Sequence, residues 1–144
     1  LLHQHLLRDK AQAARYLDLY TGDATPEEAV PALTKAVAPH LPITVLLLGM
    51  GNDMHTASLF PAASETVLAL APDAPPVMAI RSVKDEPRLT LTAPVLRGAR
   101  HLHILITGAD KHAAVSRLAE LSPLQAPVAC VLGRAPVHLS LIHL

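Results

Sequence analysis

Aromatic residues, cysteine and net charge are all scarce in this chain of 144 residues, and each shortage excludes a class of function. Two tyrosines, one phenylalanine and no tryptophan are too few for the stacking platforms that bind single-stranded nucleic acid. A single cysteine, Cys130, excludes an internal disulfide framework and a thiolate-rich zinc site, and it fits a reducing cytoplasm. The 12 basic residues equal the 12 acidic ones, so the chain has no overall attraction for nucleic acid or an anionic membrane.

Long apolar runs and a recognisable leader are also missing. The longest apolar run, residues 43–50, is far shorter than the roughly 20 residues that a membrane helix needs. Polar and charged residues interrupt the leucine-rich start, so we expect no signal peptide there. The first residue is Leu1 rather than Met, so we expect the chain to begin inside a longer protein. Half of the residues are hydrophobic, and we expect residues 1–144 to form one domain with a real core.

Hydrophobic periodicity predicts alternating helices and strands, which indicates an α/β fold with a mostly parallel sheet flanked by helices. Strands are expected at residues 43–48 (as a central parallel strand), 77–80, 88–92, 101–107, 128–132 and 137–142. The last of these follows its predecessor so closely that an antiparallel edge position is expected. Helices are expected at residues 2–16, from Thr25 to about residue 41 and at 109–121, and a short helix or turn is expected at 93–98. Thr25, Pro26 and Glu28 match the residue types of a capping box with proline at the first helical position.

The densest cluster of special residues follows the strand at residues 43–48. Its glycines, Gly49 and Gly51, let the backbone turn sharply and approach a ligand. Asp53 and His55 stand two residues apart on the turn, where a carboxylate can fix the tautomer of a proton-accepting imidazole. Thr56 and Ser58 offer hydroxyls and N–H groups at a predicted helix start, a natural site for an oxyanion or a phosphate. The alternative is an ordinary strand-to-helix turn with Asp53 as a cap.

The same stretch, residues 47–61, resembles the 6-phosphogluconolactonase pattern L-G-x-G-x-D-G-H-T-A-S-L-F-P. Three other segments resemble the family in the same order. Residues 19–29 resemble the segment before its central helix, residues 88–94 resemble R-[IL]-T-L-T-x-P, and residues 106–111 resemble a strand end with T-G-x-x-K. The four ordered matches are spread from residue 19 to residue 111, and the resemblance covers nearly the whole chain.

The resemblance implies an α/β fold like that of sugar-phosphate isomerases and deaminases. It implies hydrolysis of 6-phosphogluconolactone in the oxidative pentose phosphate pathway, in the cytoplasm, without a metal or other cofactor. His55 matches the base that activates water, and Asp53 matches the acid beside it. Arg88 and Lys111 match positions that face the substrate phosphate, and charge-assisted bonds suit that role. Gly49 and Gly51 would shape the loop, with Thr56 and Ser58 in support.

Two departures from the family pattern stand out. Met54 occupies a position where the family has glycine. If that position needs a positive φ, methionine is costly there; a turn of another form would place the side chain where it narrows the pocket. The family also carries an upstream glycine-rich turn and a D-E-R segment, which this sequence lacks. We therefore expect an N-terminally truncated lactonase with an incomplete site and an open sheet edge that favours self-association or a homo-oligomer.

Other functions are weighed against this one. Glucosamine-6-phosphate deaminase has a related motif, D-G-H-I-A-F-N-E-P, whose Asn-Glu pair is absent here. A non-catalytic sugar-phosphate-binding module would keep Arg88 and Lys111 but need not keep His55. A third alternative is that the chain is an inactive fragment. Instead of binding a phosphate, Arg88 can form an ordinary ion pair with Asp85 or Glu86.

The remaining histidines and the cysteine receive ordinary interpretations. His101 and His103 face the same side of a strand, but no third ligand suggests a metal site. The other histidines outside the motif are expected at the surface or in packing: His3, His5, His40, His112, His138 and His143. Cys130 is expected to be a small buried side chain in the strand at residues 128–132.

Overall fold

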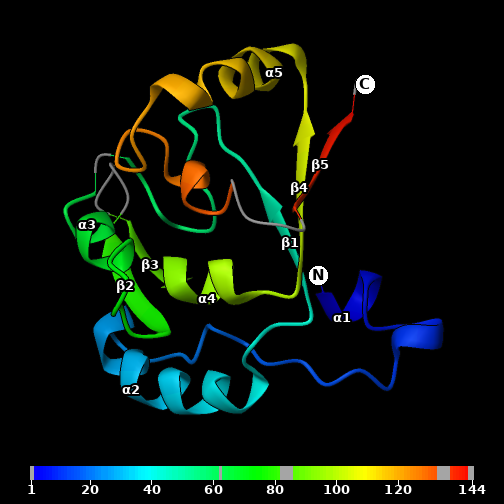
Figure 1. The fold of residues 1–144 in the computed structure, drawn as a ribbon. Coiled ribbons are helices and arrows are strands. Elements are labelled where there is room, and N and C mark those ends of the chain that lie inside the picture. Colours follow the sequence, from blue (N-terminus) through cyan, green and yellow to red (C-terminus); the bar gives the residue numbers. More distant parts are fainter. Residues whose placement is uncertain (1, 62, 82–85, 133–136, 143–144) are drawn as a thin grey trace.

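The computed structural model describes residues 2–61, 63–81, 86–132 and 137–142 (Figure 1). Its α-helices are α1 (Leu2–His5), α2 (Pro26–Val37), α3 (Glu65–Ala69), α4 (Ala93–Gly98) and α5 (Ala109–Ser116). Its strands are β1 (Val45–Gly49), β2 (Val77–Arg81), β3 (Pro87–Leu91), β4 (His101–Thr107) and β5 (Val137–Ile142). Short 3-10 helices are η1 (Asp9–Ala11), η2 (Ala38–His40), η3 (Leu118–Glu120) and η4 (Pro127–Cys130).

The strands of the described residues form two sheets. A parallel sheet has the order β1-β4-β5, and β2 pairs with β3 in an antiparallel hairpin. The predicted α/β class and the parallel sheet with flanking helices are confirmed. Two details were wrong: within the described residues β4, not β1, is the middle strand, and β5 is parallel to β4 rather than antiparallel. Val137, the first residue of β5, pairs with Leu102 near the start of β4, so the two strands run in the same direction.

The main core lies on the inner face of the parallel sheet. Leu102, Ile104 and Ile106 alternate along β4 and are at most 1% exposed. They belong to a buried cluster that includes residues of α4, α5 and η4. Figure 1 shows α4 and α5 on this side of the strands. The outer face is open in the described part of the chain, and Val45 and Leu47 there are 60% and 66% exposed.

A second, smaller core joins α2 to the hairpin. Ala29, Leu33 and Val37 line one face of α2 and pack with Val77 of β2. The helix begins at Pro26 with Thr25 as the preceding cap residue, as the sequence predicts. The Thr25 side chain makes no capping hydrogen bond, so the predicted capping box does not form.

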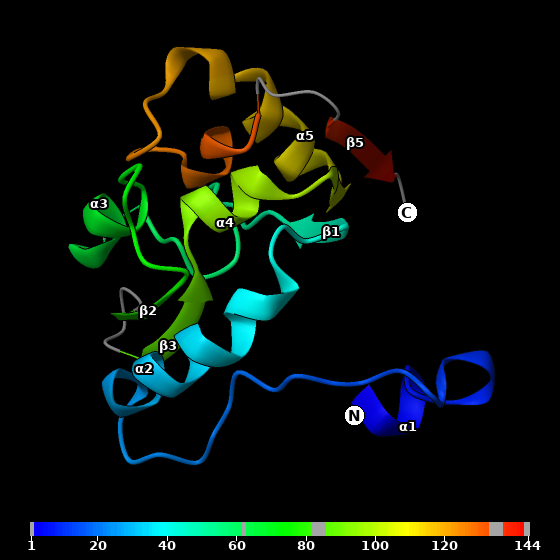
Figure 2. The ribbon, with the colours of Figure 1, turned by 60° about the horizontal axis from the view of Figure 1, so that its bottom comes forward.

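The N-terminal segment was predicted wrongly as one helix over residues 2–16. The helix α1 ends at His5, and Asp9 adopts a left-handed φ of 52° that interrupts any continuation. Figure 2 shows this segment running along the margin of the molecule, away from both cores. Short helices depend on tertiary packing for stability, and most side chains here are exposed.

Three further expectations need correction. Residues 128–132 form no strand, because Pro127 begins the 3-10 helix η4, which buries Val128. The helix predicted at residues 109–121 ends at Ser116 and is followed by η3. No helix begins at Thr56 or Ser58; α3 starts at Glu65 and was not predicted. Short apolar runs do not distinguish strands from buried helical turns.

None of the helices in the described part of the chain is long and apolar enough to cross a bilayer.

Candidate active site

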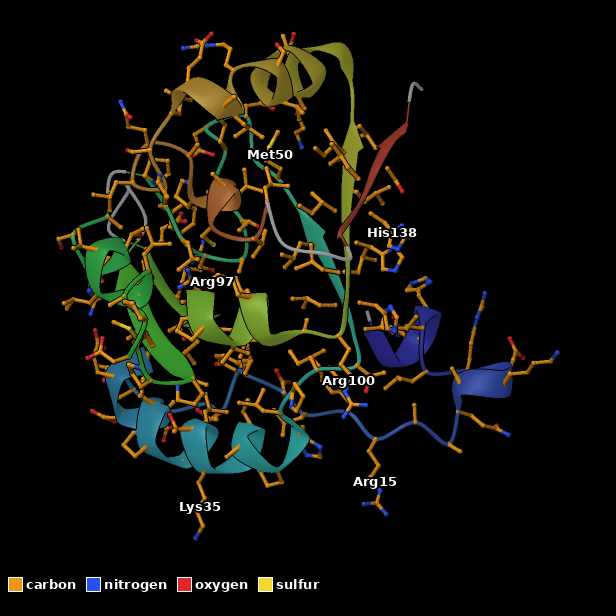
Figure 3. All side chains as sticks on the ribbon, in the orientation of Figure 1. Arg15, Lys35, Met50, Arg97, Arg100 and His138 are labelled. Carbon is orange, nitrogen blue, oxygen red and sulfur yellow. The ribbon has the colours of Figure 1, made fainter. Side chains whose placement is uncertain are left out.

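The motif loop starts at the carboxyl end of β1, which is where parallel sheets place ligands. Gly49 at the end of β1 pairs with Leu105, so β1 and β4 finish at the same edge of the sheet. The next residue, Met50, turns into the core with 3% exposure, and Figure 3 shows it beneath α5. Residues 51–55 then form a tight turn that returns to solvent.

Two hydrogen bonds close this turn. The N–H of Gly51 donates to the carbonyl of His55 at 3.0 Å, and the N–H of Met54 donates to the carbonyl of Gly51 at 3.0 Å. This is the pattern of a three-residue hairpin loop, residues 52–54, whose last residue adopts the left-handed conformation. Met54 has a φ of 65°, so the position does require the backbone that favours glycine.

Asp53 and His55 are in direct contact on the solvent side of the turn. Nδ1 of His55 lies 2.5 Å from Oδ1 of Asp53, and the same oxygen accepts the backbone N–H of His55 at 3.2 Å. A carboxylate only accepts hydrogen bonds, so the contact places the proton of a neutral imidazole on Nδ1 and leaves the Nε2 lone pair free. The His55 side chain is 32% exposed and that of Asp53 49%, so water can reach the pair.

Gly51 is needed for a reason that the sequence did not reveal. Its φ lies outside the left-handed region, so the turn itself would accept a side chain. A Cβ atom at Gly51 would lie 2.3 Å from Nδ1 of His55 and 2.6 Å from Oδ1 of Asp53. The absence of a side chain therefore makes room for the Asp53–His55 pair.

The hydroxyl groups near the loop hold its backbone in place. Thr56 is fully buried and donates to the carbonyl of Gly49 at 2.9 Å. The N–H of Ser58 donates to Oγ1 of Thr90 on β3 at 3.1 Å, which ties the loop to the hairpin. We did not single out Thr90 from the sequence, although it lies in the R-L-T-L-T segment. No local pattern shows that residues 58 and 90 meet.

Phe60 is another neighbour of the site that sequence reasoning missed. Its ring packs against the imidazole of His55 with the centroids 4.8 Å apart and the planes at 48°. The Phe60 carbonyl accepts the hydroxyl of the buried Thr66 at 2.8 Å. The single phenylalanine of the chain thus borders the proposed base.

Lys111 stands near the same sheet edge as the loop. It lies in the first turn of α5, directly after Thr107 and Gly108 at the end of β4. Gly108 has a φ of 91°, which allows the sharp turn from strand to helix. Because β1 and β4 are parallel neighbours, the sheet brings Lys111 and the loop with His55 to one end.

Arg88 lies on β3, on the same face of the strand as Thr90 because side chains alternate. Its guanidinium contacts Oε2 of Glu86 at 2.5 Å, so the predicted alternative pairing with Glu86 is confirmed; Asp85 lies outside the described residues. Arg88 also lines a cavity of about 470 Å³. The other walls of this cavity are residues 19–26, Ala29, Pro87 and Leu89. His55 is not among the residues that line this cavity.

The other histidines form no metal site in the described part of the chain, where no three His, Cys, Asp or Glu side chains group closely enough to hold an ion. His103 stacks on His138 of the neighbouring strand with the ring centroids 4.9 Å apart. Figure 3 shows His138 on the side of the sheet away from α4. His143 lies outside the described residues.

Cys130 is partly buried in η4 rather than in a strand. Burial raises the pKa of its thiol to about 11, and the nearby charge of Arg97 offsets only part of this effect. The thiol is therefore protonated at neutral pH and is a poor nucleophile.

Comparison with known proteins gives one consistent answer. Residues 1–139 match the family model described as glucosamine-6-phosphate isomerases/6-phosphogluconolactonase. A 6-phosphogluconolactonase of Rhizobium meliloti is 36% identical over 140 residues, covering 94% of this chain and 60% of that protein. A 6-phosphogluconolactonase of Pseudomonas aeruginosa is 40% identical over 126 residues, covering 81% of this chain and 50% of that protein.

Solved structures point to the same family as the sequence comparisons. The crystal structure of a 6-phosphogluconolactonase from Shewanella baltica superposes with a TM-score of 0.88 at 25% identity, covering 99% of this chain and 62% of that one. The chain thus spans about half to three fifths of the length of the relatives that it matches. By its sequence and its fold, the chain belongs to the glucosamine-6-phosphate isomerase/6-phosphogluconolactonase family.

Proposed function

We propose that this protein hydrolyses 6-phospho-D-glucono-1,5-lactone to 6-phosphogluconate. The observation that carries the proposal is the contact between Asp53 and His55, on a loop whose sequence resembles the lactonase motif. The loop lies at the carboxyl end of a parallel strand and is open to water. The relatives named above as 6-phosphogluconolactonases support the same substrate.

His55 acts as the general base. Its Nδ1 is engaged by Asp53, so Nε2 takes the proton from a water molecule as the oxygen attacks the lactone carbonyl. The carbonyl carbon becomes tetrahedral, its oxygen gains the negative charge, and the ring C–O bond then breaks. The proton on Nε2 passes to the leaving ring oxygen, and His55 returns to its neutral form. Asp53 holds the imidazole of His55 in its orientation and stabilises the imidazolium that forms between the two proton transfers.

The developing oxyanion needs hydrogen-bond donors. The N–H groups of Gly51, Met54, His55 and Ser58 already donate within the protein. We therefore assign this role to other backbone N–H groups of the loop at residues 50–56.

Lys111 and Arg88 bind the phosphate of the substrate. Fixed cations suit a phosphate, and charge-assisted hydrogen bonds to its oxygens are strong. The position of Lys111 in the first turn of α5, at the carboxyl end of the sheet, supports this role. Arg88 has to exchange Glu86 for the phosphate, because its guanidinium is engaged by that carboxylate.

The reaction belongs to the oxidative pentose phosphate pathway, and we place the protein in the cytoplasm. It requires no cofactor, since the chemistry is addition of water to an activated ester.

We also propose that the open outer face of the sheet, with its exposed Val45 and Leu47, favours self-association of the chain.

The test is hydrolysis of freshly generated lactone, corrected for its spontaneous rate. Wild-type protein is compared with His55→Ala and with His40→Ala, which removes an exposed histidine in η2, away from the loop. We expect His55→Ala to lose about 10²- to 10⁴-fold of the rate and His40→Ala to retain it. Wild-type protein that never exceeds the spontaneous rate would refute the proposal, and release of ammonia from glucosamine 6-phosphate would point to the deaminase instead.

A further inference from the structure

The residue between the two members of the Asp53–His55 pair is held in an unusual way. Met54 has a φ of 65° at the last position of the three-residue loop, where glycine is the residue that fits without strain. The family pattern has glycine there. A methionine that accepts this conformation must be kept there by interactions elsewhere.

Two such interactions are present. The Met54 side chain is only 7% exposed and belongs to the main core cluster, together with Met50, Leu59 and Val128. The Met54 carbonyl accepts the N–H of Val128, in η4, at 3.1 Å. The side chain therefore points into the protein and does not narrow the space in front of His55.

The neighbours of Met54 point the other way. Asp53 and His55 keep 49% and 32% of their side chains exposed, on either side of a residue that is buried. Their mutual contact at 2.5 Å depends on the path of the backbone through Met54. With glycine at this position, only the backbone bonds would hold that path.

We propose that Met54 is a positioning residue, whose buried side chain anchors the turn to the core and so fixes the geometry of the Asp53–His55 pair. Met54 touches neither the water nor the substrate and acts through the two residues beside it. The inference rests on the proposed role of His55 in lactone hydrolysis. In this chain, the buried side chain of Met54 stands where the family pattern has glycine.

Ala57 provides a matched control in the same loop. It also has a positive φ, 49°, but its side chain is exposed. Ala57→Gly therefore relieves the same kind of backbone strain without removing a buried group. Met54→Ala keeps a side chain on the strained backbone and removes only the anchor, while Met54→Gly removes both the anchor and the strain.

The test combines kinetics with nitrogen-15 NMR of the imidazole of His55. For Met54→Ala we expect a fall in kcat of about tenfold or more with KM within about twofold, because orientation rather than binding is disturbed. Met54→Gly should lose at least as much, whereas Met54→Leu, which restores a large apolar side chain, and Ala57→Gly should stay within about threefold of wild type. The Nδ1 signal of His55 should move toward that of an Asp53→Asn variant in Met54→Ala and not in Ala57→Gly.

Several results would overturn the proposal. Met54→Ala with a wild-type kcat and an unchanged His55 signal would show that the anchor has no effect on the pair. Equal losses in Ala57→Gly and Met54→Gly would show general loosening of the loop. If wild-type protein hydrolyses no lactone, the proposed function fails, and the NMR comparison still decides whether Met54 positions His55.

Discussion

Replacing Gly51 by alanine tests the architecture of the candidate site in a quantitative way. Ordinary contacts of a Cβ atom begin at 3.4 Å, whereas a Cβ at Gly51 would lie 2.3 Å from Nδ1 and Cε1 of His55. The imidazole must therefore retreat by about 1 Å if the backbone stays in place. The same Cβ would also press on Oδ1 of Asp53 at 2.6 Å.

The expected consequence is a loss of rate with little loss of stability. A displacement of about 1 Å in a reacting group costs on the order of 10²-fold in rate, or about 2.7 kcal/mol of transition-state stabilisation. The imidazole is 32% exposed, so it can swing toward solvent and relieve the clash without moving the core. The free energy of unfolding should therefore change by less than about 1 kcal/mol.

The assay measures kcat for lactone hydrolysis and unfolding in urea for three alanine variants. Gly98→Ala is the neutral control, because a Cβ there meets nothing within 4 Å and the residue ends α4, away from the loop. Gly49→Ala also adds its Cβ in open space and should lose less rate than Gly51→Ala. A Gly51→Ala protein with wild-type kcat would refute the claim that the Asp53–His55 pair must occupy this position.

Three further outcomes are expected. With a thiol pKa of about 11, only about one Cys130 side chain in a thousand is a thiolate at pH 8. Iodoacetamide should therefore modify Cys130 slowly in the folded chain and much faster in urea, as followed by mass spectrometry. Equal rates of modification in the two conditions would contradict the burial of the thiol. Thr66→Val removes the bond to the Phe60 carbonyl and should lower the free energy of unfolding in urea by about 1–2 kcal/mol, and an unchanged value would show that this buried bond contributes nothing. Leu47→Lys places a charge on the open sheet face and should reduce self-association in light scattering, whereas wild-type protein that stays monomeric at high concentration would count against association through this face.

Several strands were predictable from local pattern, either as short apolar runs or because their side chains alternate along the strand. β4 is the clearest example: its odd positions face outward and its even positions are buried, as the sequence of residues 101–107 suggests. The strands β1 and β3 were also located to within about two residues. Which strand is central, and the direction of β5, depend on contacts between distant segments and could not be derived from local pattern.

The failures have physical causes. Residues 2–16 have helical spacing, but a segment without a packing partner does not hold a long helix. Residues 128–132 are apolar enough for a strand, yet Pro127 sets the backbone for a helical turn, in which Val128 is buried; Val131, just after it, is buried as well.

The candidate site was likewise predictable from the sequence only in part. The contact between Asp53 and His55 could be anticipated, because two residues separated by one position on a turn meet easily. The positive φ at Met54 was one of two alternatives, and the structure decides it. The room that Gly51 leaves for the imidazole and the bond from Ser58 to Thr90 depend on three-dimensional approach, so no sequence pattern reveals them.

The most direct test of the central claim is a double-mutant cycle on the Asp53–His55 pair. Lactone hydrolysis is measured for Asp53→Asn, His55→Ala and the double variant, each corrected for the spontaneous rate. If Asp53 acts only through His55, the double variant should be no slower than His55→Ala alone, because the two losses are not additive. Fully additive losses, or a His55→Ala protein as fast as wild type, would contradict the claim that this pair activates water.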